Sequence, residues 1–558
     1  MLKRNLVETI TTSIRHHWNE PALTDFQGQT LSYGEVAARA RQLHHLFRTC
    51  GLEKGDKVAV VGRNSAHWCI TYLATITYGA VIVPILPEFT GDEIHHIVNH
   101  SDARLLFVSE AIYDRIEEVR LKQLLAILAL EDFRPLFCSD GDARELIEEA
   151  TASFTRPQPG VEPAADLGFA RVGNAELAAI IYTSGTTGFS KGVMLSHNCL
   201  MANVQFYWDN LEVHPGDEVL SFLPLAHAFG CAFEFLCPFT RGVHITFLDR
   251  LPTPKVLLKA LGEVKPKLLL AVPLIIEKIY KNRLQPLLQG RRMQVMLKLP
   301  LMNRLVYKQI HERLIETFGG RLYELVIGAA PLNREVEDFL GLIDFPFTCG
   351  YGMTECGPLI SYTAHNAGRS PYSVGRVIPY LEARILSSDP QQQVGEVLLR
   401  GENIMDGYYK DPEATAAALD ADGWFHTGDL GIIDANGCIV LKGRSKNMIL
   451  SSSGQNIYPE EIESRLNNLP YVEESLVVES NGALVALVYP DMAKVDADSV
   501  GEAALRRIMD ENCRQLNTML PPYSKVFRIR INPEEFEKTP TKKIRRGLYT
   551  LASHEAQA

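Results

Sequence analysis

The chain has 558 residues, of which 46% are hydrophobic and 22% are charged, so it can bury several hydrophobic cores and form two or more domains. Its formal net charge of −11 argues against a nucleic-acid binder held by bulk positive charge. The ten cysteines are scattered without a Cys-x-x-Cys pair, which is typical of reduced thiols rather than of disulfides or a zinc site. Residues 1–13 lack the apolar stretch of a signal peptide. We expect a cytoplasmic protein, with a peripheral position at the inner face of the membrane as the alternative.

The first part of the chain alternates strand-like and helix-like segments. Apolar, β-rich runs predict strands at residues 57–63, 80–86 and 105–109, and a helical stretch is expected at 67–78. This alternation predicts parallel sheets covered by helices. The uncharged stretch Cys69–Pro87 approaches the ~20 residues of a membrane span, but a glycine and two prolines interrupt it. We therefore expect a buried helix that leads into a buried strand.

A polar, glycine-rich loop follows the apolar residues 178–181, which predict another buried strand. Glycines let the backbone approach a polyanion, and hydroxyls and backbone N–H groups donate to phosphate oxygens. The spacing differs from a Walker A loop, which has four residues between its first Gly and Gly-Lys-[Ser/Thr]. The pattern predicts a phosphate-binding loop, and a plain surface turn is the alternative. Its residues are Thr183, Ser184, Gly185, Thr186, Thr187 and Gly188, with Lys191 three positions later.

Two segments in the middle of the chain each allow two interpretations. Residues 221–230 predict a strand end that opens onto an apolar cavity and carries His227, although a lone histidine is most often a core residue. Residues 281–313 carry eight Lys and Arg side chains among apolar ones. This basic segment could be an amphipathic face that meets an acidic membrane surface. A solvated face on ordinary helices is the alternative that we favour from the sequence.

Further along, short polar motifs predict nucleotide and metal contacts. In residues 350–358, Gly350 and Gly352 flank an aromatic residue, a pattern that suits a tight turn presenting Tyr351 to a flat base. Thr354 and Glu355 supply the hard oxygen ligands that Mg²⁺ prefers, unless the glutamate is simply solvated in a turn.

The C-terminal third carries a carboxylate, a flexible segment and a basic run. Asp429 lies between a predicted Gly turn and an apolar strand, where it could accept two hydrogen bonds from ribose hydroxyls or form an Asx turn. Residues 443–456 are polar and Ser-rich, and an α/β unit of roughly a hundred residues follows, which favours a small C-terminal domain on a hinge. Residues 538–546, KTPTKKIRR, would ordinarily be a solvated charge run.

Together these motifs, in this order, resemble the acyl-adenylate-forming (AMP-binding) superfamily of acyl-CoA synthetases, peptide-synthetase adenylation domains and luciferases. Residues 223–229 and 272–280 look most like long-chain fatty acyl-CoA synthetases. The resemblance implies an α/β fold with a large N-terminal domain of parallel-rich sheets covered by helices, a small distorted barrel, and a small mobile α+β C-terminal lid domain. It implies an ATP- and acyl-binding domain at 1–443, a hinge at 444–447 and a lid at 448–558.

The resemblance also implies a role for each matched residue. Lys543 and His227 are expected to be catalytic, and Lys542 is an alternative to Lys543. Lys446 would be the hinge, Ser453 and Gly454 would contact coenzyme A, and Glu355 and Thr183 would hold Mg²⁺. The implied ATP-binding residues are Thr183, Ser184, Gly185, Thr186, Thr187, Gly188, Lys191, Ala330, Gly350, Tyr351, Gly352, Thr354, Asp429, Arg444 and Lys543.

The activity that the resemblance implies is a two-step ligation. A fatty acid reacts with ATP to give acyl-AMP and pyrophosphate, and coenzyme A then takes the acyl group and releases AMP. The expected partners are therefore small molecules, without nucleic acid. The alternatives are a ligase that loads an acyl carrier protein and a non-catalytic nucleotide-binding scaffold. The sequence does not indicate the length of the acyl chain.

Overall fold

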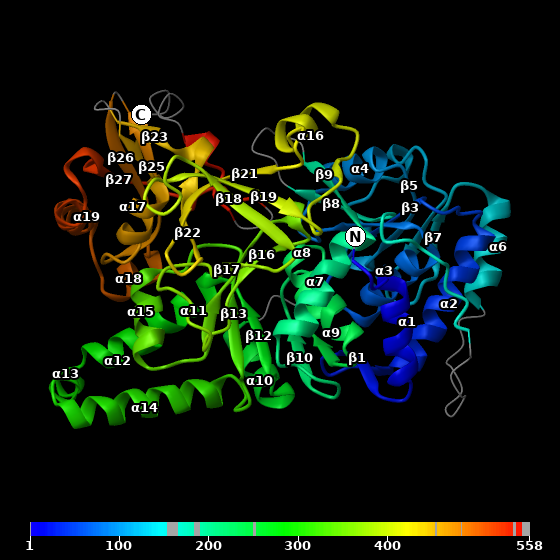
Figure 1. Cartoon of the computed structure of the whole chain (residues 1–558), viewed down its shortest axis with the longest axis horizontal. Coiled ribbons are helices and arrows are strands. Elements are labelled where there is room, and N and C mark those ends of the chain that lie inside the picture. The colour runs from blue at the N-terminus through cyan, green and yellow to red at the C-terminus, as the bar shows by residue number, and fades with distance from the viewer. Residues whose placement is uncertain are drawn as a thin grey trace.

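The computed structural model describes residues 2–152, 166–183, 190–248, 253–451, 455–480, 482–539 and 543–549. These residues form a large, sheet-rich N-terminal part and a smaller C-terminal part that lies at one end of it (Figure 1). The predicted α/β class and the division into a large and a small part are confirmed. All ten cysteines are free thiols, as expected.

The first large sheet contains the predicted strands of the N-terminal half. Strands β3, β4 and β5 pair in parallel. They are apolar and almost fully buried, as expected for parallel strands that are covered on both faces. Strand β8 ends at the predicted phosphate-binding loop and pairs antiparallel with β9. In order across the sheet the strands are β20 (Gly407–Tyr408), β9 (Lys191–Ser196), β8 (Leu177–Thr183), β4 (Val81–Ile85), β3 (Lys57–Val61), β5 (Ala103–Val108), β6 (Ala126–Ala129) and β7 (Pro135–Cys138).

A second large sheet contains strands from both ends of the N-terminal part. Its strands are parallel except for the hairpin between β1 and β2. In order they are β14 (Phe347–Cys349), β13 (Glu324–Ile327), β12 (Leu268–Ala271), β10 (Glu218–Ser221), β11 (His244–Phe247), β1 (Pro21–Asp25) and β2 (Thr30–Ser32).

Helix α3 (Ala66–Tyr78) packs between the two large sheets, because it contacts β3 and β4 of the first and β1 of the second. The Ser65 side chain accepts a hydrogen bond from the Trp68 amide at its start, and Gly79 ends it in the left-handed conformation, at φ 89°. The stretch Cys69–Pro87 is thus the buried helix and strand that the sequence predicts. Across the described residues, no helix has both the length and the hydropathy needed to cross a bilayer.

The other helices of the N-terminal part cover the sheets. They include α1 (Leu6–His16), α2 (Tyr33–Thr49), α4 (Gly91–His100), α5 (Glu110–Tyr113), α6 (Gly141–Ala152), α7 (His197–Asn210), α8 (Ala228–Gly230), α9 (Cys237–Thr240), α10 (Pro254–Val264), α15 (Arg334–Leu342) and α16 (Pro412–Ala418).

Smaller antiparallel sheets connect the two parts of the molecule. One has the strands β15 (Tyr351–Gly352), β16 (Leu359–Tyr362) and β17 (Arg376–Val377). The other has β18 (Leu381–Leu386), β19 (Gly395–Gly401), β21 (Phe425–Ile433) and β22 (Ile439–Arg444). They are two separate sheets, and the small distorted barrel stays a prediction.

The C-terminal part has its own hydrophobic core, which runs from Ile457 to Val526 and is separate from the large core that ends at Ile439. Its helices pack against a three-stranded sheet. The elements are β23 (Ile449–Leu450), β24 (Asn456–Ile457), α17 (Pro459–Leu466), β25 (Val472–Ser480), β26 (Ala483–Pro490), α18 (Met492–Ala497), α19 (Glu502–Thr518) and β27 (Val526–Ile531).

The basic segment of the sequence forms a helical arm, residues 285–317, that projects from the end of the N-terminal part (Figure 1). It follows α11 (Pro273–Ile279) and the π-helix η3 (Tyr280–Leu284). The arm consists of α12 (Gln285–Gln289), α13 (Arg291–Leu297) and α14 (Pro300–Thr317).

Candidate functional site

The centre of the candidate site is the buried carboxylate of Asp429. Strands β21 and β22 pair so that Asp429 lies opposite Arg444, whose Nε is 2.8 Å from Asp429 Oδ1. The Tyr351 hydroxyl donates a hydrogen bond of 2.6 Å to Oδ2. Burial raises the pKa of Asp429, and the Arg444 charge and the Tyr351 hydrogen bond oppose that rise. Each carboxylate oxygen keeps a further lone pair, so the group can still accept hydrogen bonds from the two hydroxyls of a ribose.

The local backbone at two motifs differs from the predicted turns. Asp429 lies inside strand β21, and Gly428 next to it adopts φ 69° within the strand rather than in a tight turn. Tyr351 begins the short strand β15, which pairs with β16, so the expected tight turn is absent there. Gly352 is required because a Cβ would lie 2.4 Å from the Pro358 carbonyl oxygen. The glycines alone would allow the backbone to turn, but pairing with β16 holds it extended.

Glu355 and Lys191 meet at the side chain of Tyr408. Glu355 lies on the 3₁₀ turn Thr354–Cys356, and its Oε1 accepts a hydrogen bond of 3.0 Å from the Tyr408 hydroxyl. The Lys191 Nζ lies 5.0 Å from the centroid of the Tyr408 ring and 3.9 Å from Asp411 Oδ2. One aromatic side chain therefore links the predicted magnesium ligand to the predicted phosphate-binding lysine. Tyr408 belongs to none of the sequence motifs, so the motifs do not predict its role.

The donors present suit a magnesium ion that is shared with a nucleotide. Among the described residues there is no cluster of three or more His, Cys, Asp or Glu side chains that could enclose a metal by itself. Magnesium at nucleotide sites typically takes one or two carboxylates and completes its shell with phosphates and water. Glu355, with the Thr183 hydroxyl as the second predicted ligand, fits that requirement.

The phosphate-binding loop is described at its two ends. Thr183 is the last residue of β8, and it pairs with Lys191, the first residue of β9. The strand and the lysine thus lie where the sequence predicts. The predicted residues Ser184, Gly185, Thr186, Thr187 and Gly188 lie outside the described residues, as do Ser453, Gly454 and Lys542.

The segment after β13 supplies the remaining nucleotide candidates. Ala330 is exposed, and it follows Ala329, whose φ of 71° is left-handed. The Gly350 amide donates a hydrogen bond of 2.9 Å to the Ile327 carbonyl, which holds the start of the Tyr351 motif against the end of β13. Both segments therefore meet at one edge of the second large sheet.

The C-terminal basic run is held against the C-terminal part at both of its ends. Lys538 pairs with Glu474 at 2.7 Å, and Arg546 pairs with the buried Glu463 of α17. On either side of residues 540–542, which lie outside the described residues, the Thr539 amide donates a hydrogen bond of 2.8 Å to the Lys543 carbonyl. The described residues of the run are thus anchored to the C-terminal part at both ends rather than forming a freely solvated tail, and Lys543 is one of them.

Lys543 reaches the other site residues electrostatically. Lys543 is an exposed residue, but partial burial of its ammonium and the Arg444 charge lower its pKa, and the charges of Asp429 and Glu355 oppose this shift. The charge of Lys543 in turn lowers the pKa of His227, after the larger effect of burial. The charges of residues from separate sequence motifs thus act on one another in this region.

His227 is a neutral hydrogen-bond donor in this site. Burial, with the smaller effect of Lys543, lowers its pKa to about 4. Its Nδ1 accepts a hydrogen bond of 3.3 Å from the Phe229 amide at the start of α8, so the proton of the neutral ring is on Nε2. The adjoining Phe229 ring packs against Gly328, where a Cβ would lie 3.1 Å from the ring. His227 therefore offers an N–H group beside an apolar wall.

The predicted hinge lies between the two hydrophobic cores. Lys446 is exposed in the 3₁₀ turn Ser445–Asn447. On one side of it Lys442 pairs with Glu461 at 3.0 Å, and on the other the Asn447 side chain donates to Glu460 at 2.6 Å. These bonds hold the turn against α17. Rotation about Lys446 stays a prediction.

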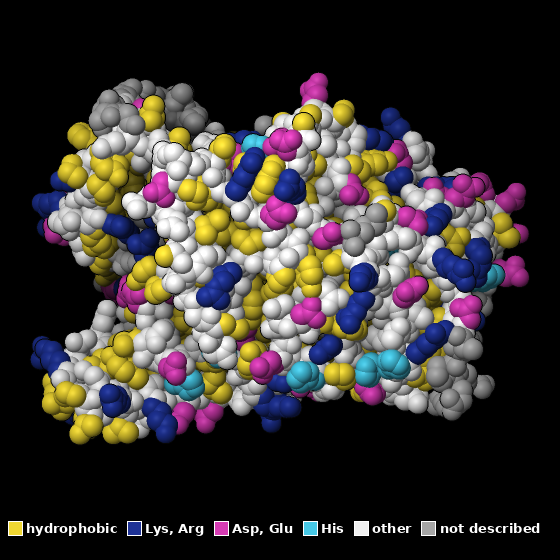
Figure 2. Space-filling model, viewed as in Figure 1, with side chains coloured by type: hydrophobic (Ala, Val, Ile, Leu, Met, Phe, Trp, Pro, Cys, Tyr) yellow, Lys and Arg dark blue, Asp and Glu magenta, His cyan; other side chains and the backbone are white. Residues whose placement is uncertain are grey.

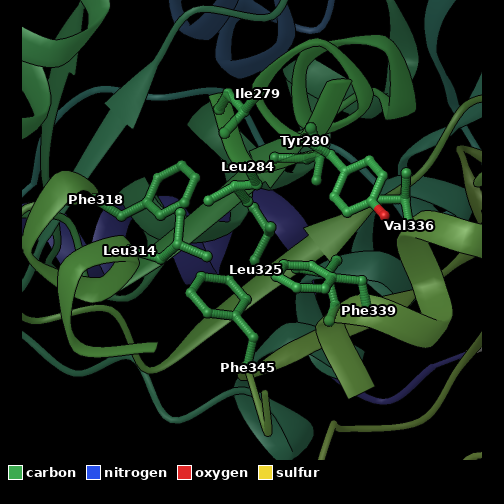
Figure 3. A pocket seen from close by; sticks show the side chains of 11 residues that line it. Ile279, Tyr280, Leu284, Leu314, Phe318, Leu325, Val336, Phe339 and Phe345 are labelled. Carbon is green, nitrogen blue, oxygen red and sulfur yellow. The ribbon is translucent and has the colours of Figure 1, made fainter. Parts of the chain in front are cut away.

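A small apolar cavity lies at the root of the arm (Figure 3). Its volume is ≈ 10 Å³, which is about the space that one water molecule needs. In this form it has no room for an acyl chain. The cavity is lined by Ile276, Ile279, Tyr280, Leu284, Leu314, Phe318, Leu325, Val336, Phe339, Leu340 and Phe345.

Comparison with known proteins relates most of the chain to one family and to several ligases. Residues 10–409 match the family model described as "AMP-binding enzyme". The chain is 29% identical to the peroxisomal long chain acyl-CoA synthetase 6 of Arabidopsis thaliana, over 92% of this chain and 79% of that protein. It is 28% identical to the long-chain-fatty-acid–CoA ligase FadD15 of Mycobacterium bovis (89% and 86% covered). It is 26% identical to 4-coumarate–CoA ligase 1 of Petroselinum crispum (81% and 77% covered).

Solved structures share the fold along the whole chain. ATP-bound MatB from Rhodopseudomonas palustris superposes with a TM-score of 0.75 at 24% identity, covering 100% of both chains. The anthranilate CoA ligase AuaEII in complex with anthranoyl-AMP has a TM-score of 0.78 at 20% identity, covering 100% of this chain and 98% of that one. At these identities the likeness concerns the fold.

Proposed function

This chain belongs to the AMP-binding enzyme family, and from that premise we propose that it is an ATP-dependent ligase that joins long-chain fatty acids to coenzyme A. At the coarser level it is a CoA ligase that works through an acyl-adenylate, with ATP, Mg²⁺ and coenzyme A as its small-molecule requirements. The observation that carries the proposal is the convergence of Lys543 with Asp429, Glu355 and His227. A nucleotide-binding scaffold has no need of a lysine delivered from the C-terminal part.

The first half-reaction joins the acid to the nucleotide. A carboxylate oxygen of the acid attacks the α-phosphorus of ATP, the bond to the β-phosphate oxygen breaks, and pyrophosphate leaves. The attacking carboxylate is already ionised, so this step needs alignment and charge neutralisation rather than a general base. Mg²⁺, held by Glu355 and the phosphates, would neutralise phosphate charge when bound.

The residues of this chain have separate tasks in that step. Asp429, fixed by Tyr351 and Arg444, holds the ribose, and the Lys543 ammonium approaches the carboxylate and the α-phosphate. Lys191 is the cation beside the loop that holds the β- and γ-phosphates. The neutral His227 donates its Nε2–H toward the acid, and at neutral pH it adds no second positive charge.

The second half-reaction transfers the acyl group to a thiol. The sulfur of coenzyme A attacks the acyl carbon, its proton is lost, and AMP leaves. Because Lys543 lies on the C-terminal part, rotation of that part about Lys446 would withdraw the ammonium and open the acyl carbon to the thiol. We include this rotation, and the division at residues 444–447, in the proposal. The separate core of the C-terminal part supports it.

Two points support a long-chain acid as the substrate. Two of the relatives described above carry that activity in their names. The wall beside His227 is apolar, with Phe229 packed on Gly328, as an aliphatic chain requires. Each further methylene buried there adds about 0.8 kcal/mol, so the preferred length depends on how deep the apolar space extends.

The proposal is tested by AMP release in the presence of coenzyme A, with acids from acetate to oleate and with 4-coumarate. We expect kcat/KM to rise with chain length and 4-coumarate to be a poor substrate. A preference for 4-coumarate would replace the fatty acid by an aryl acid. Acid-dependent AMP release with an acyl carrier protein but without release with coenzyme A would replace the acceptor.

A further inference from the structure

The arm, residues 285–317, carries a local charge opposite to that of the whole chain. The chain has a net charge of −11, but between residues 281 and 311 there are seven Lys and Arg residues and no Asp or Glu. The first acidic residue after them is Glu312, which pairs with Lys308 at 3.8 Å. An ordinary solvated helix mixes both signs of charge on its outer face, so this segregation requires another explanation.

The outer end of the arm also exposes large aliphatic side chains. Leu301 is 78% exposed, Val295 63% and Leu305 57%. Figure 2 shows yellow side chains gathered over this end of the molecule, with dark blue ones at their edges. Contiguous apolar surface rimmed by charge is a feature of interaction sites rather than of a solvated face.

Helix α14 has one apolar stripe that faces the protein and a second that faces outward, as expected for a helix that lies on a surface. Its inward stripe is Val306, Ile310 and Leu314, which are buried at a spacing of four residues. Leu301 and Leu305, also four apart, project outward in its first half. The inward stripe already attaches the helix to the protein, so the outward leucines do not serve the core.

We propose that the outer end of the arm docks on a bilayer that contains anionic phospholipids. Its aliphatic side chains would enter the headgroup boundary, and Arg291, Arg292, Lys298 and Arg304 would meet lipid phosphates. Helices with this composition lie in the plane of the interface, and each Lys or Arg near an anionic surface strengthens the attachment.

Charge selects the bilayer over a second copy of the chain. In a symmetric dimer the same patch would face itself and bring the basic residues of two arms together, which is unfavourable. A nucleic acid would complement the charge, but it gives the exposed leucines no apolar partner. An anionic bilayer satisfies both the charge and the aliphatic side chains.

The test is co-sedimentation of the full chain with vesicles of phosphatidylcholine alone and with vesicles that contain about one third phosphatidylglycerol. We expect binding to the anionic vesicles that weakens with added salt. Leu301→Ser/Leu305→Ser should weaken the partition roughly a hundredfold, because two leucines leave the lipid. Arg291→Gln/Arg292→Gln should weaken it roughly thirtyfold.

Matched control variants change equally exposed residues elsewhere. Val119→Ser/Leu146→Ser removes two exposed aliphatic side chains, and Arg506→Gln/Arg514→Gln removes two exposed charges from α19. Both controls should bind like the unmodified chain. Thermal unfolding should give the same midpoint for all four variants, since none of these side chains is in a core.

Three results would overturn the proposal. One is equal binding to neutral and anionic vesicles. Another is equal binding by the arm variants and their controls. The third is a dimer in sedimentation velocity that the arm variants dissociate, because this would assign the patch to a second copy. The proposal is independent of the acid that the enzyme activates.

Discussion

The Lys281 ammonium donates a hydrogen bond of 2.7 Å to the backbone carbonyl of Val472, and thereby joins the root of the arm to the C-terminal part. Burial lowers the pKa of Lys281. Lys278 lies 3.9 Å from Glu473, and Asn333 bonds to Asn468, in the same contact region. These bonds hold the C-terminal part in the position in which Lys543 reaches the site.

Lys281→Met should therefore slow the first half-reaction by about tenfold, because a hydrogen bond from a charged donor is lost from the adenylating position. Thioester formation from supplied acyl-AMP should not slow. The measurement is single-turnover kinetics of each half-reaction in the absence of membranes. Lys308→Met, an exposed lysine on the arm, is the matched control. An equal loss in both half-reactions would show that Lys281 does not favour one position.

Lys446→Pro should have the opposite effect, since proline fixes φ at the predicted pivot. Acyl-AMP should form at a normal rate and accumulate, while transfer to coenzyme A slows by tenfold or more. Lys446→Ala leaves the backbone free and should behave normally. Rapid-quench analysis of acyl-AMP gives the result directly. Normal overall turnover by the proline variant would show that Lys446 is not the hinge.

Tyr408 should act as a positioning residue for Glu355. Tyr408→Phe keeps the ring beside Lys191 but removes the hydrogen bond to Glu355, a loss of about 1 kcal/mol. We expect the Mg²⁺ concentration for half-maximal activity to rise roughly fivefold, with little change in kcat. Tyr409→Phe removes a hydroxyl that bonds instead to Asp102 and is the control. A drop in kcat at saturating Mg²⁺ without a shift in the magnesium requirement would contradict this role.

The strands of the first large sheet could be predicted because they are continuous apolar runs separated by helical segments. Candidate site residues could be named because their motifs are local in sequence, and their roles stay predictions. The hydrogen bonds of Tyr408 and Lys281 could not be predicted from the sequence, because each joins segments that only tertiary packing brings together. At Tyr351, pairing with β16 overrides the turn that two glycines suggest. The orientation of such side chains is set by partners far along the chain.

Stability should depend on pH through His197. Its imidazole is fully buried, and no hydrogen-bond partner for it is found among the described residues. Burial lowers its pKa to about 4. Its unfolded pKa is about 6.5, so the unfolded state binds the proton first as pH falls. The contribution of His197 to the free energy of unfolding is therefore present above about pH 6.5 and is lost as the pH falls toward 4.

Between pH 7 and pH 5, this one group should lower the free energy of unfolding by about 2 kcal/mol. Denaturant titrations of the unmodified chain and of His197→Leu should show that the substitution removes that part of the slope. His214→Leu, a surface substitution, should keep it. Identical slopes for His197→Leu and the unmodified chain would show that His197 is not protonated on unfolding in this range.

The role proposed for Lys543 is to support adenylate formation from the C-terminal part. Its most direct test is ATP–pyrophosphate exchange that depends on added fatty acid, measured for the unmodified chain, Lys543→Ala and Lys525→Ala. Lys525 is an exposed lysine of the same part. We predict fatty-acid-dependent exchange that falls roughly a hundred- to a thousandfold in Lys543→Ala alone, while that variant still converts supplied acyl-AMP and coenzyme A to the thioester. Undiminished exchange in Lys543→Ala, or exchange that does not depend on the acid, would contradict the account.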